Sequence, residues 1–165
     1  MSRQGRILAM QHSEKLPSFA SPTEAAIYYH GFRDKHLAIL SELAAKCPSF
    51  QPDYSAESLK QLEQWYFQLY ETDSFHAEGI DRETFEICMA MYFGETTVRS
   101  AHARWIVEPY FLAPDKYELG IRKGPFTMML SRFTDHFREP GNKKRESLFR
   151  RYKKYFARDM PGRSI

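Results

Sequence analysis

Residues 81–101 carry the pattern that most constrains how this chain can fold. At helical spacing, one apolar stripe consists of Phe85, Cys88 and Tyr92, and a second consists of Ile87, Met91, Gly94 and Val98. A helix that is apolar on two faces is covered by other elements on both sides. Inside a helix Gly94 costs about 1 kcal/mol relative to Ala, so we expect a backbone or an aromatic ring to pack closely there. The pattern therefore predicts a buried central helix over residues 81–101.

Capping signals and periodicity predict further helices on both sides of the central one. Ser21, Pro22 and Glu24 are typical of a helix start, and the pattern continues over residues 21–46. A second helix follows over residues 55–71, with Ser55 as its cap. Two more are predicted by apolar stripes: one from Gly124-Pro125 onward, with Phe126, Met129, Leu130, Phe133 and Phe137, and one over residues 143–158, with Leu148, Phe149, Tyr152, Tyr155 and Phe156.

After the central helix the period changes to that of β-strands. Residues 103–107 and 117–121 alternate or are β-branched, and a long loop through Pro109 to Lys116 joins them as an antiparallel hairpin. The predicted fold class is α+β: a mostly helical single domain of about five helices with one antiparallel β-hairpin. We expect this domain to span residues 21–158, preceded by a flexible N-terminal segment (1–20) and followed by a tail (159–165).

Composition restricts the class of protein. With 165 residues, 42% hydrophobic and 15% aromatic, the chain is long enough for one sizeable core. No apolar run approaches the ~20 residues of a transmembrane segment. Cys47 and Cys88 are the only cysteines; they form no CxxC spacing, and we expect Cys88 to be an inert core thiol. Because the N-terminus lacks the apolar core of a signal peptide, the predicted location is cytoplasmic.

The sequence lacks the motifs of common enzymes. It contains no Gly-rich nucleotide loop, no G-x-S-x-G nucleophile turn and no H-E-x-x-H zinc pair. The six histidines are scattered, and His30 and His36 do not share a helical face. We therefore expect a non-catalytic protein with no catalytic residue, no cofactor and no metal site.

One polar cluster continues a stripe of the central helix. Glu95, Arg99 and His102 follow each other at helical spacing, and Arg104 and Trp105 open the next strand. In a functional interpretation they form a polar pocket, with Glu95 as acid, base or hydrogen-bond anchor and Trp105 as an apolar wall. In a structural interpretation Glu95 pairs with Arg99 and locks the helix onto the hairpin, while His102 caps the helix. We favour the structural interpretation, because no nucleophile or metal site accompanies the group.

Positive charge is concentrated near the C-terminus. Residues 138–165 hold ten Lys or Arg against three Asp or Glu, a net of +7, whereas residues 1–137 hold 14 against 18, a net of −4. Since the charges lie opposite an aromatic stripe, the simplest interpretation is a solvated face. The alternatives are binding to an acidic protein surface, such as that of a second copy, to nucleic acid or to an anionic membrane. The candidate basic surface consists of Lys143, Lys144, Arg150, Arg151, Lys153 and Lys154.

Three short stretches carry a resemblance to known proteins: Met91-Tyr92-Phe93-Gly94-Glu95, Trp105 and Leu119-Gly120-Ile121. Together they resemble small bacterial α+β proteins of uncharacterised families, some of which look like immunity proteins. These proteins share a Gly-Glu helix followed by a Trp-bearing hairpin. The similarity covers about residues 55–137 and leaves out the basic helix. It implies an architecture and not a reaction.

The predicted function is non-catalytic: the protein binds another protein, as an immunity-like module does. The partner can also be a second copy of this chain. This prediction rests on the missing catalytic motifs, on the opposite net charges of residues 1–137 and 138–165, and on Phe67, which lies off the apolar stripe of its helix. Phe67 is either covered by another element, which we favour, or available to a partner. The alternative function is an accessory role in nucleic-acid binding through the basic C-terminal helix. A third hypothesis is a small-molecule pocket around Glu95 and Trp105.

Overall fold

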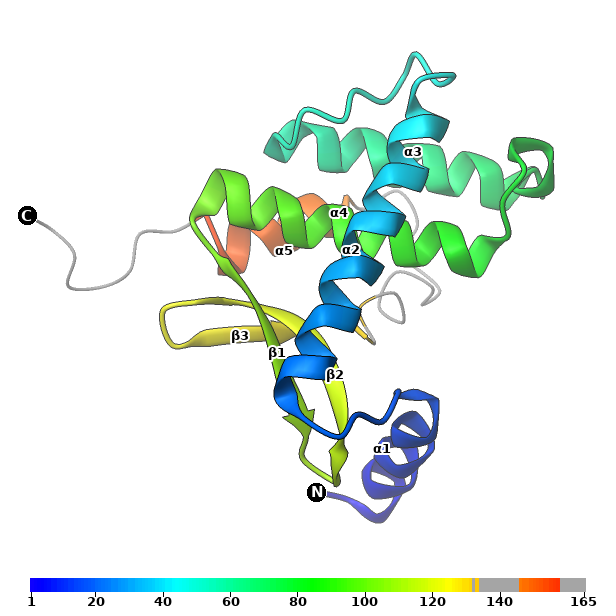
Figure 1. Cartoon of the computed structure of the whole chain (residues 1–165). Helices are drawn as coiled ribbons and strands as arrows, with labels where there is room; N and C mark the ends of the chain where they lie inside the picture. Colours follow the sequence, from blue (N-terminus) through cyan, green and yellow to red (C-terminus); the bar gives the residue numbers. More distant parts are fainter. Residues whose placement is uncertain (132, 134–145, 158–165) are drawn as a thin grey trace, which may run out of the picture.

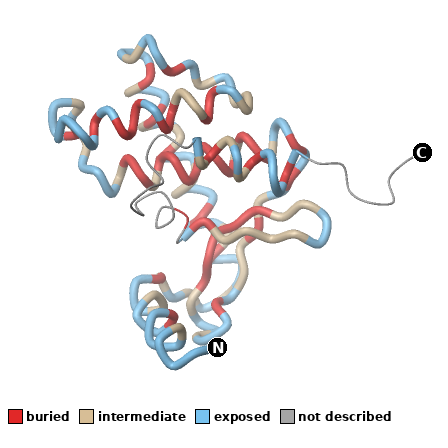
Figure 2. The backbone as a smooth tube through the Cα atoms, turned by 180° about the vertical axis from the view of Figure 1, so that it is seen from behind, coloured by how far each residue is buried: buried red, intermediate tan, exposed pale blue. Residues whose placement is uncertain are grey.

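The helix predicted to be central, α4 (Arg82–Ala101), lies at the core of the computed structural model, which describes residues 1–131, 133 and 146–157. Asp81 caps it, since its Oδ1 accepts a hydrogen bond from the Thr84 N–H at 2.7 Å. Most of its side chains are buried, and it packs against both helices and the sheet. Buried residues run through the helical part of the molecule and into the sheet (Figure 2). The predicted central helix is confirmed.

The sheet follows α4 directly and has three antiparallel strands in the order β1-β2-β3. Strands β1 (Arg104–Tyr110) and β2 (Ala113–Lys123) form the predicted hairpin. Both strands are longer than expected, so that only Phe111 and Leu112 separate them in place of a long loop. Strand β3 (Phe126–Met129) pairs with the end of β2 and was not predicted.

Gly94 lets the hairpin lie directly against α4. A Cβ at this position would lie 2.9 Å from Leu130 Cδ1 and 2.9 Å from Trp105 Cζ2, and closer still to Cη2 of the same indole. Side chains do not approach each other so closely, so only glycine leaves room for the ring. The predicted close contact at Gly94 is confirmed.

Helices α2 (Pro22–Ala44) and α3 (Ala56–Glu71) begin where the capping signals place them. Ser21 Oγ accepts a hydrogen bond from the Glu24 N–H at 3.2 Å, and Ser55 Oγ accepts one from the Ser58 N–H at 3.1 Å. A short 3₁₀ helix, η1 (His76–Glu78), connects α3 to α4. Helix α2 packs against α4 and reaches β1, so it joins the helical layer to the sheet (Figure 1).

The helix predicted from Gly124-Pro125 onward is wrong where the structure describes the chain. Residues Phe126–Met129 form strand β3 because Gly124 takes a φ of +57° and, with Pro125, makes a two-residue turn out of β2. Leu130 and Phe133 are buried, as the apolar pattern required. Apolar residues three and four positions apart suited a helix, but they also suit a short strand followed by a turn. Phe137 lies outside the described residues.

The first helix of the structure, α1 (Arg3–Lys15), lies in a segment where no helix was expected. Its sequence shows no apolar stripe, and Ala9 is its one buried residue. Hydrogen bonds from the hairpin hold it in place: Tyr110 Oη donates to the Ala9 carbonyl at 2.9 Å, and Lys116 Nζ donates to the Leu16 carbonyl at 3.0 Å. Helix α1 lies beside the far end of the hairpin (Figure 1).

The last described helix, α5 (Ser147–Tyr155), is capped by side chains of other elements. At its N-terminus the buried Glu63 of α3 accepts hydrogen bonds from Ser147 Oγ at 2.5 Å and from the Leu148 N–H at 3.2 Å. At its C-terminus Lys123 of β2 donates to the Phe156 carbonyl. Each charge has the sign that the helix dipole favours at that end. The cross-element caps fix the position of α5 on the core.

Two predictions about buried residues are confirmed. Phe67 is 6% exposed, so it is covered by the fold and offers no ring to a partner. Cys88 is fully buried, and burial raises the pKa of its thiol to about 12, which keeps the sulfur protonated and unreactive.

Within the described residues, none of the helices has the length and apolar content needed to span a bilayer.

Candidate functional site

The predicted polar cluster forms at the junction of α4 and β1. Trp105 Nε1 donates a hydrogen bond to Glu95 Oε2 at 2.8 Å, and Arg99 Nε donates to the other oxygen, Oε1, at 2.9 Å. The Glu95 side chain is 15% exposed and that of Arg99 is 56% exposed. Both oxygens of the carboxylate are therefore engaged by groups of this chain.

Cation–aromatic contacts extend this cluster to two further elements. The Arg99 guanidinium lies 3.8 Å from the centre of the Tyr54 ring, in the loop before α3. The Arg33 guanidinium of α2 lies 5.5 Å from the Trp105 ring centre. Tyr54 stacks in turn on Tyr92, with ring centres 4.9 Å apart. Arg33 and Tyr54 could not be predicted from the sequence, because no spacing along the chain connects them to Glu95.

His102 and Arg104 lie at the surface beside the cluster. His102 ends α4 with a φ of +60°, and its backbone N–H donates to the Thr97 carbonyl. Arg104 is exposed on β1 and is paired in register with Arg122 of β2. Of the five predicted residues, the structure thus joins Glu95, Arg99 and Trp105 and leaves the other two outside.

This geometry favours the structural interpretation of the cluster. A general acid or base needs an oxygen that can reach a substrate, and both oxygens of Glu95 already accept charge-assisted hydrogen bonds. Trp105 packs over Gly94 instead of bordering an open space. The cluster fastens α4, β1, α2 and the loop before α3 to one another.

The predicted basic surface is present on the described part of α5. Arg150, Lys153 and Lys154 are exposed, and Arg151 is half-buried, with its guanidinium 5.2 Å from the Phe133 ring centre. Lys143 and Lys144 lie outside the described residues. The opposite face of the helix docks on the core, as predicted, through the buried side chains of Leu148, Tyr152 and Phe156.

Three cations of this surface have no ion-pair partner among the described residues. No carboxylate oxygen of the described chain lies within 4.0 Å of Arg150, Lys153 or Lys154. The ammonium groups of the two lysines lie 5.6 Å and 5.1 Å from the ring centres of Phe149 and Tyr155, on their own helix. These three side chains are exposed and meet no opposite charge in the described part of the chain.

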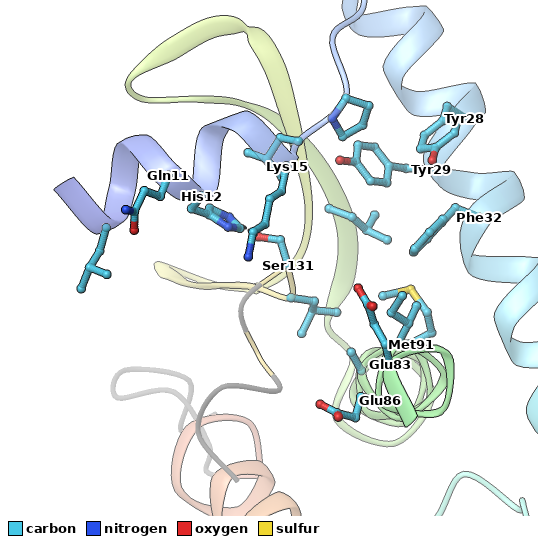
Figure 3. Close-up of a pocket in the computed structure, with 17 residues that line it drawn as sticks. Gln11, His12, Lys15, Tyr28, Tyr29, Phe32, Glu83, Glu86, Met91 and Ser131 are labelled. Carbon is cyan, nitrogen blue, oxygen red and sulfur yellow. Dashed lines mark hydrogen bonds between the residues drawn. The ribbon is translucent and has the colours of Figure 1, made fainter. Parts of the chain in front are cut away.

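The structure also contains a cavity of about 540 Å³ that sequence analysis did not find. Helices α1, α2 and α4 surround it together with β2 and the end of the sheet (Figure 3). Its volume lies within the range of small-molecule sites. Its walls come from segments more than a hundred residues apart, since Leu8 and Leu130 both line it. No local motif could have indicated it.

His12, Ser131 and Glu118 meet beside this cavity. Ser131 Oγ donates to Glu118 Oε1 at 2.8 Å, and His12 Nε2 lies 3.2 Å from that hydroxyl and 3.4 Å from the same carboxylate oxygen. In a Ser-His-acid triad the serine and the acid contact opposite nitrogens of the imidazole. Here both contact Nε2 and the hydroxyl donates to the acid, so the arrangement does not activate Ser131. It fastens α1 to the sheet.

Across residues 1–131, 133 and 146–157, no group of three or more His, Cys, Asp or Glu residues could hold a metal ion. Two candidate features of the described molecule are the basic face of α5 and the cavity between α1, α2 and α4, which we call the cavity behind α1.

Comparisons with known proteins relate most of the chain to one family. A model of the family described as "Uncharacterised protein YwmA" matches residues 18–156, which include α2 to α5 but not α1. Uncharacterized protein YwmA of Bacillus subtilis (strain 168) is 32% identical over 116 residues, which cover 68% of this chain and 72% of that protein. No solved structure matches the chain. The expected resemblance to small uncharacterised bacterial proteins is confirmed, but it extends beyond the expected residues 55–137 and includes α5: the chain belongs to the YwmA family.

Proposed function

We propose that this protein is a non-catalytic module that binds a partner protein with an acidic surface through the basic face of α5. The observation that carries the proposal is that Arg150, Lys153 and Lys154 are exposed and have no ion-pair partner within the described residues. An acidic partner would meet three cations without breaking an ion pair within the described chain. Complementary charge of this kind speeds association and selects the partner.

The fixed position of α5 supports the same proposal. Its apolar face is buried in the core, and Glu63 and Lys123 hold its two ends. A surface that is ordered before binding loses less conformational entropy when a partner docks. More narrowly, we propose that the protein acts as an immunity-like module in the cytoplasm and holds its partner through this helix.

The same cations favour nucleic acid as a second candidate partner. Lys and Arg neutralise phosphates without reading a sequence, which gives weak binding that is sensitive to salt. Single-strand binding also uses aromatic rings on which bases stack. On α5 Tyr152 is buried and the Tyr155 ring already stacks on Phe126, with ring centres 4.8 Å apart. A protein partner is therefore favoured over single-stranded nucleic acid.

Photo-crosslinking from α5 in cells tests the proposal. Replacement of Tyr155 by p-benzoylphenylalanine places a reactive group beside the cations and keeps an aromatic ring against Phe126. We expect discrete protein adducts that survive nuclease treatment. They should disappear when Arg150→Gln, Lys153→Gln and Lys154→Gln are combined. Combining Arg6→Gln, Lys35→Gln and Lys46→Gln removes three exposed charges elsewhere and should leave the adducts unchanged.

Fluorescence anisotropy with short duplex DNA distinguishes the second candidate. Nucleic acid would replace protein as the partner if duplex affinity fell linearly with salt on logarithmic axes and the adducts required intact nucleic acid. Adducts of equal yield in both triple variants would contradict a role for the α5 cations with either partner.

A further inference from the structure

The cavity behind α1 exposes apolar and polar surface in similar amounts, and ligand sites pair apolar surface with placed polar groups. Phe32 of α2 and Ile87 and Met91 of α4 supply apolar surface, and Tyr28 and Tyr29 extend the aromatic wall (Figure 3). Tyr28 and Phe32 are stacked, with ring centres 6.0 Å apart. A ligand that fits this wall carries apolar side chains or an apolar body.

Two opposite charges border the cavity from different helices. Lys15 of α1 and Glu83 of α4 both line it and are exposed, so the cavity is reached from solvent. In the described part of the chain neither has an ion-pair partner within 4.0 Å. Figure 3 shows Lys15 on the α1 side, beside His12 and Ser131, and Glu83 on the α4 side.

The remaining charged groups of the lining are engaged within the protein. The Glu86 carboxylate lies 3.2 Å from Arg82 Nε, and His12 contacts Glu118 and Ser131. Lys15 and Glu83 each stand near the helix end that favours their sign, in the last turn of α1 and the first turn of α4. That preference explains a charge at each helix end but not their placement around one cavity.

We propose that the cavity binds a short apolar peptide with free ends, its carboxylate at Lys15 and its ammonium at Glu83. A sphere of about 540 Å³ is about 10 Å across, and an extended chain of two or three residues spans roughly 7–10 Å. The peptide's side chains pack on the aromatic wall.

Titration calorimetry with three forms of one dipeptide tests this proposal. The probes are Leu-Phe with both ends free, N-acetyl-Leu-Phe, which lacks the cation, and Leu-Phe-amide, which lacks the anion. We expect the free dipeptide to bind most tightly and each blocked form to bind about fivefold more weakly, the effect of one partly exposed ion pair.

Variants assign each end of the peptide to one side chain. Lys15→Gln should weaken the free dipeptide about fivefold and leave the affinity for the amide unchanged. Glu83→Gln should likewise weaken the free dipeptide and leave the affinity for the acetylated form unchanged. Lys35→Gln, at an exposed cation of α2 away from the cavity lining, should bind as the original protein does. Ile87→Trp should fill the cavity and abolish binding, while circular dichroism confirms the fold.

Three outcomes would overturn the proposal. These are no heat of binding with any form at millimolar dipeptide, equal affinity for all three forms, or a loss in Lys15→Gln that is the same for the free dipeptide and its amide. The combined Arg150, Lys153 and Lys154 variant should bind the dipeptide normally, because α5 does not line the cavity. The two proposals therefore succeed or fail separately.

Discussion

Gly94 and Gly31 both lie inside long helices, but their surroundings differ. A Cβ at Gly94 would overlap the Trp105 indole and Leu130, whereas a Cβ at Gly31 would meet nothing within 4 Å. The first glycine is required by the packing of the hairpin. The second only costs helix stability, by about 1 kcal/mol relative to Ala.

Alanine substitutions at these two glycines should therefore have opposite effects. We expect Gly94→Ala to lower the free energy of unfolding by about 1–3 kcal/mol, because the added methyl group displaces the indole ring. Gly31→Ala should raise it by about 0.5–1 kcal/mol. Urea denaturation followed by circular dichroism measures both. A Gly94→Ala protein as stable as the original would show that Trp105 does not lie against this position.

At the scale of single residues, contacts between neighbours on one helix could be predicted from the sequence. The spacing of Glu95 and Arg99 predicts their pair, and the cost of Gly94 predicts a close neighbour. Arg33 and Tyr54 were missed because the tertiary fold alone brings them to Trp105 and Arg99. The cavity was missed for the same reason.

At the scale of elements, α5 depends on side chains from outside the helix. Glu146, in the N-cap position, makes no side-chain capping bond and has a φ of +54°. Glu63 of α3 supplies the cap instead. Burial raises the pKa of the Glu63 carboxyl, and the hydrogen bonds from Ser147 and Leu148 lower it in part, so that it remains above its ordinary value of 4.5.

The raised pKa of Glu63 predicts how stability depends on pH. Between 4.5 and the folded-state pKa, the folded protein binds more protons at this carboxyl than the unfolded chain does. This contribution to the free energy of unfolding is complete below pH 4.5 and is lost as the pH rises through the folded-state pKa. Urea titrations at a series of pH values should show a decline in this window, and Glu63→Gln should remove it.

The matched control for this measurement is Glu57→Gln, which alters an exposed carboxyl of the same helix. It should keep the decline with rising pH. An unchanged pH profile in Glu63→Gln would mean that Glu63 has the same pKa in the folded and unfolded protein, contrary to its burial.

The elements that sequence analysis placed correctly are those with local signals. Helices α2, α3 and α4 each start at a side-chain cap that can be identified in the sequence. Strand β3 was mistaken for a helix because a Gly-Pro pair can open a helix or make a hairpin turn. Helix α1 was missed because polar contacts with strands about a hundred residues away stabilise it. Such contacts leave no apolar periodicity in the sequence of the helix.

At the scale of the whole molecule, α1 is set apart from the rest. It lies outside the region matched by the family model, and polar contacts from the hairpin and the end of the sheet hold it in place. Helix α4, by contrast, is buried over most of its length. The free energy needed to open the two helices should differ accordingly.

Hydrogen exchange should resolve this difference. We expect the amides of α1 to exchange through local opening and those of α4 to exchange most slowly. Tyr110→Phe removes the hydrogen bond to the Ala9 carbonyl and should speed exchange in α1 about fivefold, the effect of about 1 kcal/mol, without changing α4. Equal acceleration in both helices would indicate instead that α1 opens only when the whole protein unfolds.

The caps of α5 also imply an order of events in time. An isolated helix of nine residues is too short to persist in water. Its caps come from positions 84 residues earlier at one end and 33 residues earlier at the other. The helix can therefore form only after α3 and β2 have taken their places. Its basic face is thus a late product of folding, so a partner that recognises this face selects finished molecules over incomplete ones.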